Sequence, residues 1–268
     1  MNNLAALIIL VFSPWRPLLE SEVKDYLGRI GISAALLMVV ELTYRSARLE
    51  RYRQILVGLL ILSVAVSLDL IFGTYLIKAL GVTDIAPVGW AVQKLNEGFI
   101  VISAIILLNK TAGDSPGSIY LQKGNLKLGL IIGAATFLLA AAGSFLMAGL
   151  FKARDLSIAR ITPWIPWLLI YVLVNGTMEE LMFRGLFLRK LQPFFGKIIS
   201  NFLVAFVCTG LHGTVTYSAD NLLFLAVTFP LALLWGYLMQ KTDSMWGSIW
   251  FDGGMDIPIM LGIFSNLA

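Results

Sequence analysis

Three charged residues interrupt a long apolar stretch in the last third of the sequence. The segment 163–188 reads PWIPWLLIYVLVNGTMEELMFRGLFL and contains Glu179, Glu180 and Arg184. Each charge at the centre of a bilayer costs about 2.5–3.5 kcal/mol, so such residues face a protein interior or a wet cavity. Glu180 and Arg184 are four positions apart on a helix and can form an ion pair. Glu179 lies about 100° around the helix from Glu180, is not needed for this ion pair, and is therefore available for catalysis. The alternative is that all three residues only lock helices together.

The single histidine, His212, ends the apolar stretch NFLVAFVCTGLHG. A lone histidine in such a stretch is often a core residue with a structural partner. Its depth, however, favours a site. Counted from the connector between the two segments, Glu179 lies about 15–18 Å deep and His212 about 22 Å deep on the next, antiparallel helix. We expect the two side chains to face each other across one cavity.

A third pair of charges lies in the last apolar stretch, GSIWFDGGMDIPIM, where Asp252 and Asp256 share one helical face. Asp256 lies roughly 16 Å along its helix, counted from the same side of the membrane as Glu179 and His212. Three helices therefore bring Glu179, His212 and Asp256 to similar depth. The alternative is a wet helix end, softened by Gly and Pro. Asp69 in VSLDLIF has no partner in this scheme, and we expect it to be structural.

A carboxylate and an imidazole across a wet pocket can together deprotonate a water molecule and direct it at a carbonyl carbon. The resulting oxyanion needs hydrogen-bond donors, which an imidazolium or nearby amides can supply. A zinc site fits poorly, because catalytic zinc usually has three protein ligands and the chain has one His and one Cys, Cys208. The sequence predicts water activation without a metal or a cofactor.

The composition indicates what positions these residues. The 268 residues are 58% hydrophobic and 13% charged, with a mean hydropathy of +0.84. Soluble domains have about 25% charged residues, so the composition argues against a soluble globular protein. Disordered chains lack apolar surface to bury, so disorder is excluded. We predict an all-α polytopic transmembrane helix bundle with an intramembrane cavity. The net charge of +4 and pI near 9.2 fit basic loops at a membrane rather than nucleic-acid binding.

A membrane-spanning helix needs about 20 mostly apolar residues. Nine stretches qualify approximately, and the first is doubtful because Pro14 and Pro17 break it, so we expect about eight spans. The stretches are 3–20, 28–44, 55–77, 96–109, 127–151, 163–188, 198–212, 221–239 and 245–264. Gly129 and Gly133 form a GxxxG pair, for which close helix packing is the expected role.

The basic residues predict an orientation. Four arginines fill the connector 45–53, which marks it as cytoplasmic. Alternation then places 11 Lys and Arg on the cytoplasmic side and 8 on the other side, with Arg184 inside a span. We therefore expect an integral multi-pass protein, in the plasma (inner) membrane of a prokaryote.

The segment Glu179-Glu180-Leu-Met-Phe-Arg184 resembles the EExxxR motif of the CAAX protease and bacteriocin-processing (CPBP, or Abi) family of glutamic intramembrane proteases. The histidine on the following span and the segment KTDSMWGSIW are also similar to that family. The resemblance implies that Glu179 and His212 activate the attacking water and that Glu180 and Arg184 hold the helix. It also implies a helical bundle whose cavity opens to the cytoplasmic side and to lipid.

Three positions depart from the family's motifs. Cys208 stands where the second motif, FxxxH, has Phe, while Asp256 and Met260 stand where the third motif has His and Asn. The family's residues there are thought to bind the oxyanion. An ionised aspartate would repel an oxyanion, whereas a neutral one donates a hydrogen bond. Three interpretations of Asp256 therefore remain open. It donates a hydrogen bond to the oxyanion in place of the histidine, it changes the substrate specificity of the site, or catalysis is lost.

The sequence thus predicts an intramembrane endopeptidase that cleaves a peptide bond near the membrane, with 161–268 as its catalytic core and 1–160 as N-terminal helices without readable chemistry. Its expected partners are the lipid bilayer and a membrane-embedded or lipid-anchored substrate, in maturation or C-terminal sorting of exported proteins. Two alternatives stay open. One is an inactive family member acting as a scaffold, regulator or immunity protein. The other is a transporter that uses Glu179, Asp256 and Asp69 as ion sites.

Overall fold

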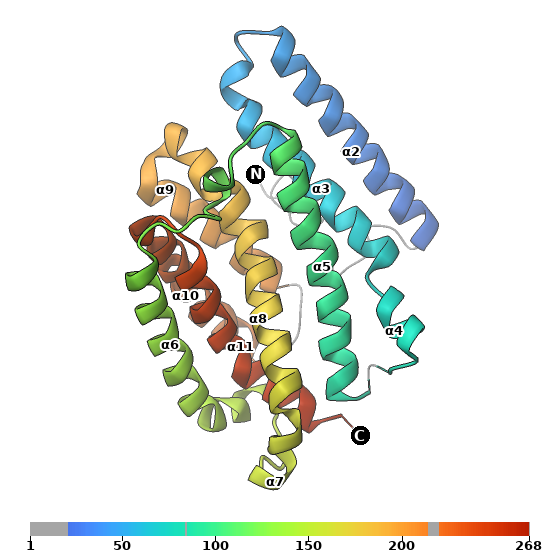
Figure 1. The fold of residues 1–268 in the computed structure, drawn as a ribbon, viewed down its shortest axis with the longest axis vertical. Helices are drawn as coiled ribbons and strands as arrows, with labels where there is room; N and C mark the ends of the chain where they lie inside the picture. Colours follow the sequence, from blue (N-terminus) through green and yellow to red (C-terminus); the bar gives the residue numbers. More distant parts are fainter. Residues whose placement is uncertain (1–20, 84, 214–219, 268) are drawn as a thin grey trace.

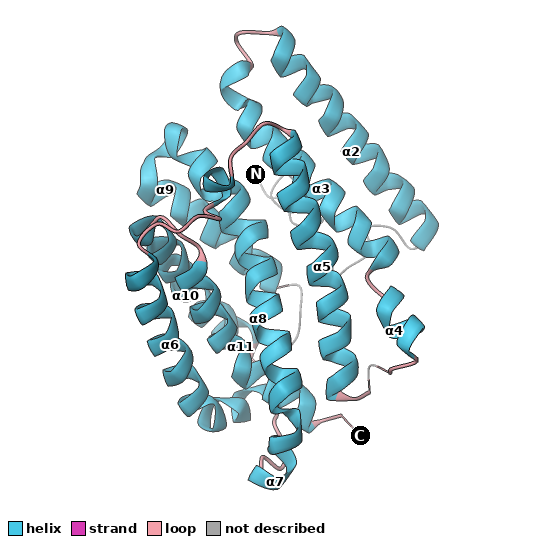
Figure 2. Cartoon of the chain, viewed as in Figure 1, coloured by secondary structure: helices cyan, strands magenta, loops and turns pink. Residues whose placement is uncertain are grey.

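A computed structural model describes residues 21–83, 85–213 and 220–267, and these residues form helices and connectors without a strand (Figures 1 and 2). The predicted all-α class is confirmed. The α-helices are α2 (Glu22–Arg45), α3 (Arg53–Phe72), α4 (Tyr75–Leu80), α5 (Pro87–Thr111), α6 (Leu126–Met147), α7 (Ile158–Ile161), α8 (Ile165–Glu180), α9 (Leu186–His212), α10 (Asn221–Thr242) and α11 (Trp246–Ser265). Short 3₁₀ turns lie at Glu50–Tyr52, Pro116–Ile119, Ala148–Phe151 and Thr162–Trp164, and a π-helical turn lies at Leu181–Gly185.

Six helical segments of the described chain are long and apolar enough to cross a membrane, which supports an integral multi-pass protein. They are Glu22–Arg45, Glu50–Leu80, Pro87–Thr111, Leu126–Phe151, Ile158–His212 and Asn221–Thr242. The predicted number of about eight spans is approximate. The 55-residue segment Ile158–His212 contains two of the predicted stretches. Helix α11, the last predicted stretch, is not among the six. The predicted stretch 3–20 lies outside the described residues.

The segment Ile158–His212 folds back on itself within α9. Gly196 has φ 69° and ψ 175°. These values lie outside the helical region, and residues with a side chain rarely adopt them. The chain reverses its direction at this residue. As a result, His212 comes within 3.6 Å of Glu179, although 33 positions separate the two residues in the sequence. Figure 1 shows this turn at the upper left of the bundle. The predicted antiparallel pair of stretches 163–188 and 198–212 is therefore present.

Helix α8 lies at the centre of the bundle, where α5 and α11 pack on it (Figure 1). Helix α6 covers the other side of α11, α10 packs on α9, and α3 packs on α5. Helix α2 packs chiefly on α3 and is mostly exposed. Many exposed side chains are large and apolar, as a lipid-facing surface requires.

The GxxxG pair of α6 contacts α11 directly. A Cβ atom added to Gly133 would lie 2.6 Å from the Gly247 carbonyl oxygen, and one added to Gly247 would lie 2.6 Å from the Gly129 carbonyl oxygen. The two backbones therefore touch, which only glycine permits at this crossing. The expected role of Gly129 and Gly133 in helix packing is confirmed.

We expect Gly133→Ala to destabilise the protein by about 1–3 kcal/mol, because the new methyl group overlaps α11 backbone that cannot move away. The matched control is Gly143→Ala on the same helix, where an added Cβ has no atom within 4 Å. Thermal unfolding in detergent measures both. Equal melting temperatures for the two variants would contradict this packing.

One end of the bundle is closed by connectors that hydrogen-bond to one another. The Met245 amide donates to the Tyr120 carbonyl oxygen at 3.1 Å, and the Asn125 amide donates to the Thr242 carbonyl oxygen at 2.6 Å. Asp243 forms an ion pair with Arg189 and accepts a hydrogen bond from the Gln122 side chain. These bonds join the α5–α6 connector, the start of α9 and the α10–α11 turn.

Candidate active site

The two glutamates end α8, and the π-helical turn Leu181–Gly185 follows them directly. Such turns are rare and are found frequently at functional sites. Glu179 is 6% exposed, and Glu180 and Arg184 are fully buried. The Arg184 Nη1 atom donates to Glu180 Oε1 at 2.6 Å, so the ion pair expected from the spacing is present.

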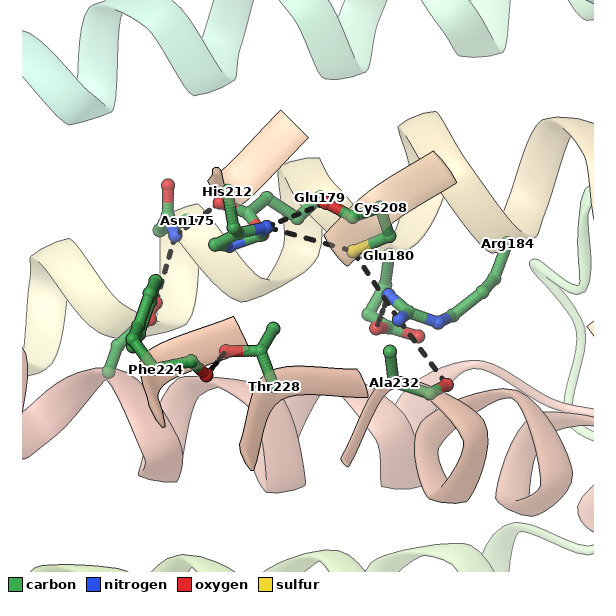
Figure 3. Close-up of polar contacts among 10 residues, drawn as sticks. Asn175, Glu179, Glu180, Arg184, Cys208, His212, Phe224, Thr228 and Ala232 are labelled. Carbon is green, nitrogen blue, oxygen red and sulfur yellow. Dashed lines mark hydrogen bonds and ion pairs between the residues drawn. The ribbon is translucent and has the colours of Figure 1, made fainter. Parts of the chain in front are cut away.

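Arg184 connects α8 to two other helices (Figure 3). Its Nη2 atom contacts Cys208 Sγ on α9 at 3.6 Å and the Ala232 carbonyl oxygen on α10 at 3.4 Å. The guanidinium also lies over the Trp235 ring, 4.9 Å from its centroid. Cys208, at the position of the family's phenylalanine, is thus part of the arginine's environment. These contacts tie three helices together behind Glu179.

Glu179 and His212 face each other from adjacent helices. His212 Nε2 lies 3.6 Å from Glu179 Oε2, and His212 Nδ1 lies 2.9 Å from the Cys208 carbonyl oxygen. Because a carbonyl oxygen only accepts, Nδ1 carries a proton and donates it in this bond. Nε2 is then the ring nitrogen that can exchange a proton on the side of Glu179.

Asn175 lies one helical turn before Glu179 and connects it to α11. Its Nδ2 atom donates to Glu179 Oε1 at 3.0 Å and to Asp256 Oδ2 at 2.8 Å. The structure thereby brings Asp256 to the same site as Glu179 and His212. Sequence reasoning missed Asn175, although its position four residues before Glu179 on the same helical face was a usable signal.

A cavity of about 320 Å³ lies beside this group, between α10, α11 and the turn after α6. His212, Asp252 and Asp256 contribute polar groups to its wall next to this group, and most of the remaining wall is apolar. Glu179 is not part of the wall. It faces the wall residue His212 directly and is connected to the wall residue Asp256 through Asn175. A mostly apolar cavity with a few polar groups is typical of a ligand or substrate site.

Two residues considered from the sequence lie elsewhere. Asp69 on α3 lines a separate cavity of about 280 Å³ with Gln93 and Glu97. Met260, at the position of the family's asparagine, is 2% exposed and packs in an apolar cluster that includes Ile257. The structure therefore does not bring Asp69 or Met260 to the group around Glu179. Among the described residues, no group of three or more His, Cys, Asp or Glu side chains has the arrangement of a metal site.

Comparison with known protein families agrees with the motif. Residues 161–257 match the family model described as "Type II CAAX prenyl endopeptidase Rce1-like". This range contains Glu179, Glu180, Arg184, His212 and Asp256. No curated protein and no solved structure matches the chain at a significant level. The resemblance of this chain to the CAAX protease and bacteriocin-processing family is thus confirmed by its Rce1-like segment, residues 161–257.

Proposed function

We propose that this protein is a glutamic-type intramembrane endopeptidase in which Glu179 and His212 activate a water molecule. The family match supports an intramembrane protease of the CAAX type. The observation that carries the finer proposal is the pair of Glu179 Oε2 and His212 Nε2, 3.6 Å apart beside a cavity inside the bundle. At that separation both atoms can contact one water molecule that lies beside the pair.

In the proposed reaction, Glu179 and His212 remove a proton from this water as its oxygen bonds to the substrate's carbonyl carbon. The carbonyl oxygen becomes an oxyanion. The proton is then delivered to the amide nitrogen, the oxyanion's electron pair re-forms the carbonyl, and the carbon–nitrogen bond breaks. The products are an amine and a carboxylic acid, which loses its remaining proton to the amine or to solvent as it leaves. His212 suits the transfer because the Cys208 carbonyl oxygen fixes its ring orientation.

The oxyanion in this proposal is stabilised by donors on the α11 side of the site. Asp256, in place of the family's histidine, accepts a hydrogen bond from Asn175 through one oxygen. When neutral, its other oxygen can donate to the oxyanion. Glu180 and Arg184 are proposed to position the helix, because both are buried away from the cavity wall.

Asn175 is proposed as a positioning residue that orients the Glu179 carboxylate. We expect Asn175→Ala to lower kcat by about 100-fold at unchanged KM, because small misplacement of a reacting group has effects of this size. The pH profile of kcat should also shift, since Glu179 loses a donor. The control Thr177→Val, on the same helix, removes only a hydroxyl bonded to the Leu173 carbonyl oxygen. A lower melting temperature with unchanged kcat would assign Asn175 a structural role instead.

The experiment that tests the proposed function is proteolysis in proteoliposomes or co-expressing cells. Candidate substrates are membrane-anchored proteins of the same genome, and mass spectrometry reads the new termini. We expect wild-type protein to produce a terminus that Glu179→Ala and His212→Ala do not. Identical termini in all three samples would overturn the catalytic assignment.

The second candidate function is a non-catalytic membrane scaffold, regulator or immunity protein. It is favoured by Asp256 and by Met260, whose burial leaves the position of the family's asparagine without a polar group at the site. A partner protein that depends on the chain but not on Glu179 distinguishes this function from proteolysis.

The wider setting is proposed on the same basis. Substrates are membrane-embedded or lipid-anchored chains, processed during maturation or C-terminal sorting at the plasma membrane of a prokaryote. Residues 161–268 form the catalytic core, and the N-terminal helices support it. The N-terminal helices α5 and α6 pack on the core helices α8 and α11, respectively.

A further inference from the structure

A second hollow, separate from the cavity beside His212, lies between α3 and the two arms of α9. The arms are residues 186–195 and 197–212, before and after the reversal at Gly196. We call this hollow the α3–α9 groove. Its volume is about 230 Å³, and every described side chain that lines it is apolar. Its wall includes Ile55, Leu59, Phe187, Leu191, Val204 and Val207.

The groove lies on a side of the bundle that faces lipid. Phe202 and Phe206, which each directly precede a groove residue on the second arm, are 49% and 55% exposed. Protein interiors are closely packed, and a hollow leaves its wall without contacts on one side. Water is a poor filler for this hollow, because an apolar wall offers it no hydrogen bond. An acyl chain of the bilayer can supply the missing contacts.

One end of the groove has a cation on its α3 wall. Arg51 precedes the groove residue Ile55 by four positions, and its guanidinium lies over the Tyr52 ring, 4.6 Å from the centroid. The Tyr52 ring stacks on the Phe194 ring of the first arm, with centroids 5.6 Å apart. The start of α3 and the reversal of α9 therefore lie at the same end of the bundle (Figure 1).

A second cation lies at this end on the α9 wall. Lys197 is the first residue of the second arm and precedes the groove residue Val204 by seven positions. Seven positions are two turns on one helical face, so Lys197 lies about 10 Å along the arm from Val204, toward the end that carries Arg51. The long, flexible stems of lysine and arginine let both charged groups reach one phosphate between them.

Arg51 and Lys197 are available for such a ligand. Both are exposed, and neither forms an ion pair with a described residue. By contrast, Lys190 on the first arm is paired with Asp114 at 3.0 Å. An apolar groove that ends between two unpaired cations is complementary to a molecule with an acyl chain and a negatively charged headgroup. Basic pockets between membrane helices bind anionic lipid headgroups in this way.

We infer that the α3–α9 groove binds one acyl chain of an anionic phospholipid of the bilayer, with the lipid phosphate between Arg51 and Lys197. No described residue lines both this groove and the cavity of the candidate active site. The groove residue Leu211 directly precedes His212, so the bound chain packs against the arm that presents His212 to Glu179. The lipid site does not depend on the proposed protease function.

The experiment is native mass spectrometry of the full-length protein in a neutral detergent, titrated with phosphatidylglycerol or with zwitterionic phosphatidylcholine of the same acyl chains. The attraction of two basic residues for an anionic headgroup corresponds to about a 30-fold preference for phosphatidylglycerol. We expect this preference in the wild type. The double variant Arg51→Gln with Lys197→Gln should bind the two lipids within about threefold of each other.

The matched control is Lys110→Gln with Lys127→Gln, which removes two exposed lysines at the same end of the bundle, on α5 and α6. The control should keep the preference. Equal binding of the two lipids to the wild type, or an equal loss of preference in the control, would overturn the inference. Inorganic phosphate is the third probe, because it has the charge without the acyl chain. If phosphate displaced the lipid as effectively as free phosphatidylglycerol, the groove would have no part in binding.

A phosphatidylglycerol with a photoreactive diazirine in one acyl chain locates the bound chain. We expect cross-links to Leu59 or Val207, identified by mass spectrometry after digestion. Leu138 and Leu139 on α6, which are 67% and 73% exposed, report general contact with lipid. Cross-links no more frequent in the groove than at these two leucines would contradict the inference. The occupant of the groove would then be residues 1–20 of this chain or a second copy of it.

Discussion

Replacing Glu179 by Gln is expected to lower the rate of substrate cleavage by about 10²–10⁴-fold while the protein stays folded. General-base catalysis contributes a factor of this size, and glutamine keeps the shape of glutamate but cannot take a proton from water. Oε1 accepts a hydrogen bond from Asn175 and Oε2 faces His212, so an amide can keep the Asn175 bond through its oxygen. The measurement is the cleavage rate in proteoliposomes per folded molecule.

The matched control for this variant is Asp25→Asn. Asp25 is a buried carboxylate, 4% exposed, that pairs with Arg29 on α2, the helix at the edge of the bundle. We expect its cleavage rate per folded molecule to equal that of the wild type. A cleavage rate of Glu179→Gln within threefold of the wild type would show that Glu179 is not the base.

The second large effect is expected from Arg184→Met, which should destabilise the protein by about 3–5 kcal/mol. Glu180 would be left at a position with no exposure and no opposite charge beside it, and removing one partner of a buried ion pair has this cost. For a protein of this size the change corresponds to a fall in melting temperature of roughly 10 °C. Thermal unfolding in detergent measures it.

Two further variants show whether the buried pair is the cause. The double variant Glu180→Gln with Arg184→Met removes both charges and should recover most of the lost stability. Arg53→Met breaks an exposed pair with Glu50 and should cost less than about 1 kcal/mol. If the double variant were as unstable as Arg184→Met, the loss would come from packing around the arginine rather than from the unpaired charge.

The sequence by itself determined the class of the protein and the residues worth testing. Composition and the spacing of apolar stretches predicted a helical membrane bundle. Both depend on the free energy of transferring a segment from water to the bilayer, which local sequence determines. The cost of charge in a bilayer singled out Glu179, Glu180 and Arg184, and the four-residue spacing predicted the ion pair that the structure contains. Depth along two antiparallel helices predicted that His212 faces Glu179, and the two atoms lie 3.6 Å apart.

Only the tertiary structure decided which helix faces meet and which residues line the cavity. Asn175 joins Glu179 to Asp256 because α8 and α11 present those faces to each other, a rotation that residue spacing does not encode. Asp69 lies in a different cavity, although it is a buried acid in the same bilayer. The place of His212 beside Glu179 follows from the reversal at Gly196. These arrangements depend on how helix faces rotate and pack against distant parts of the chain, and residue spacing gives depth along a helix but not that rotation.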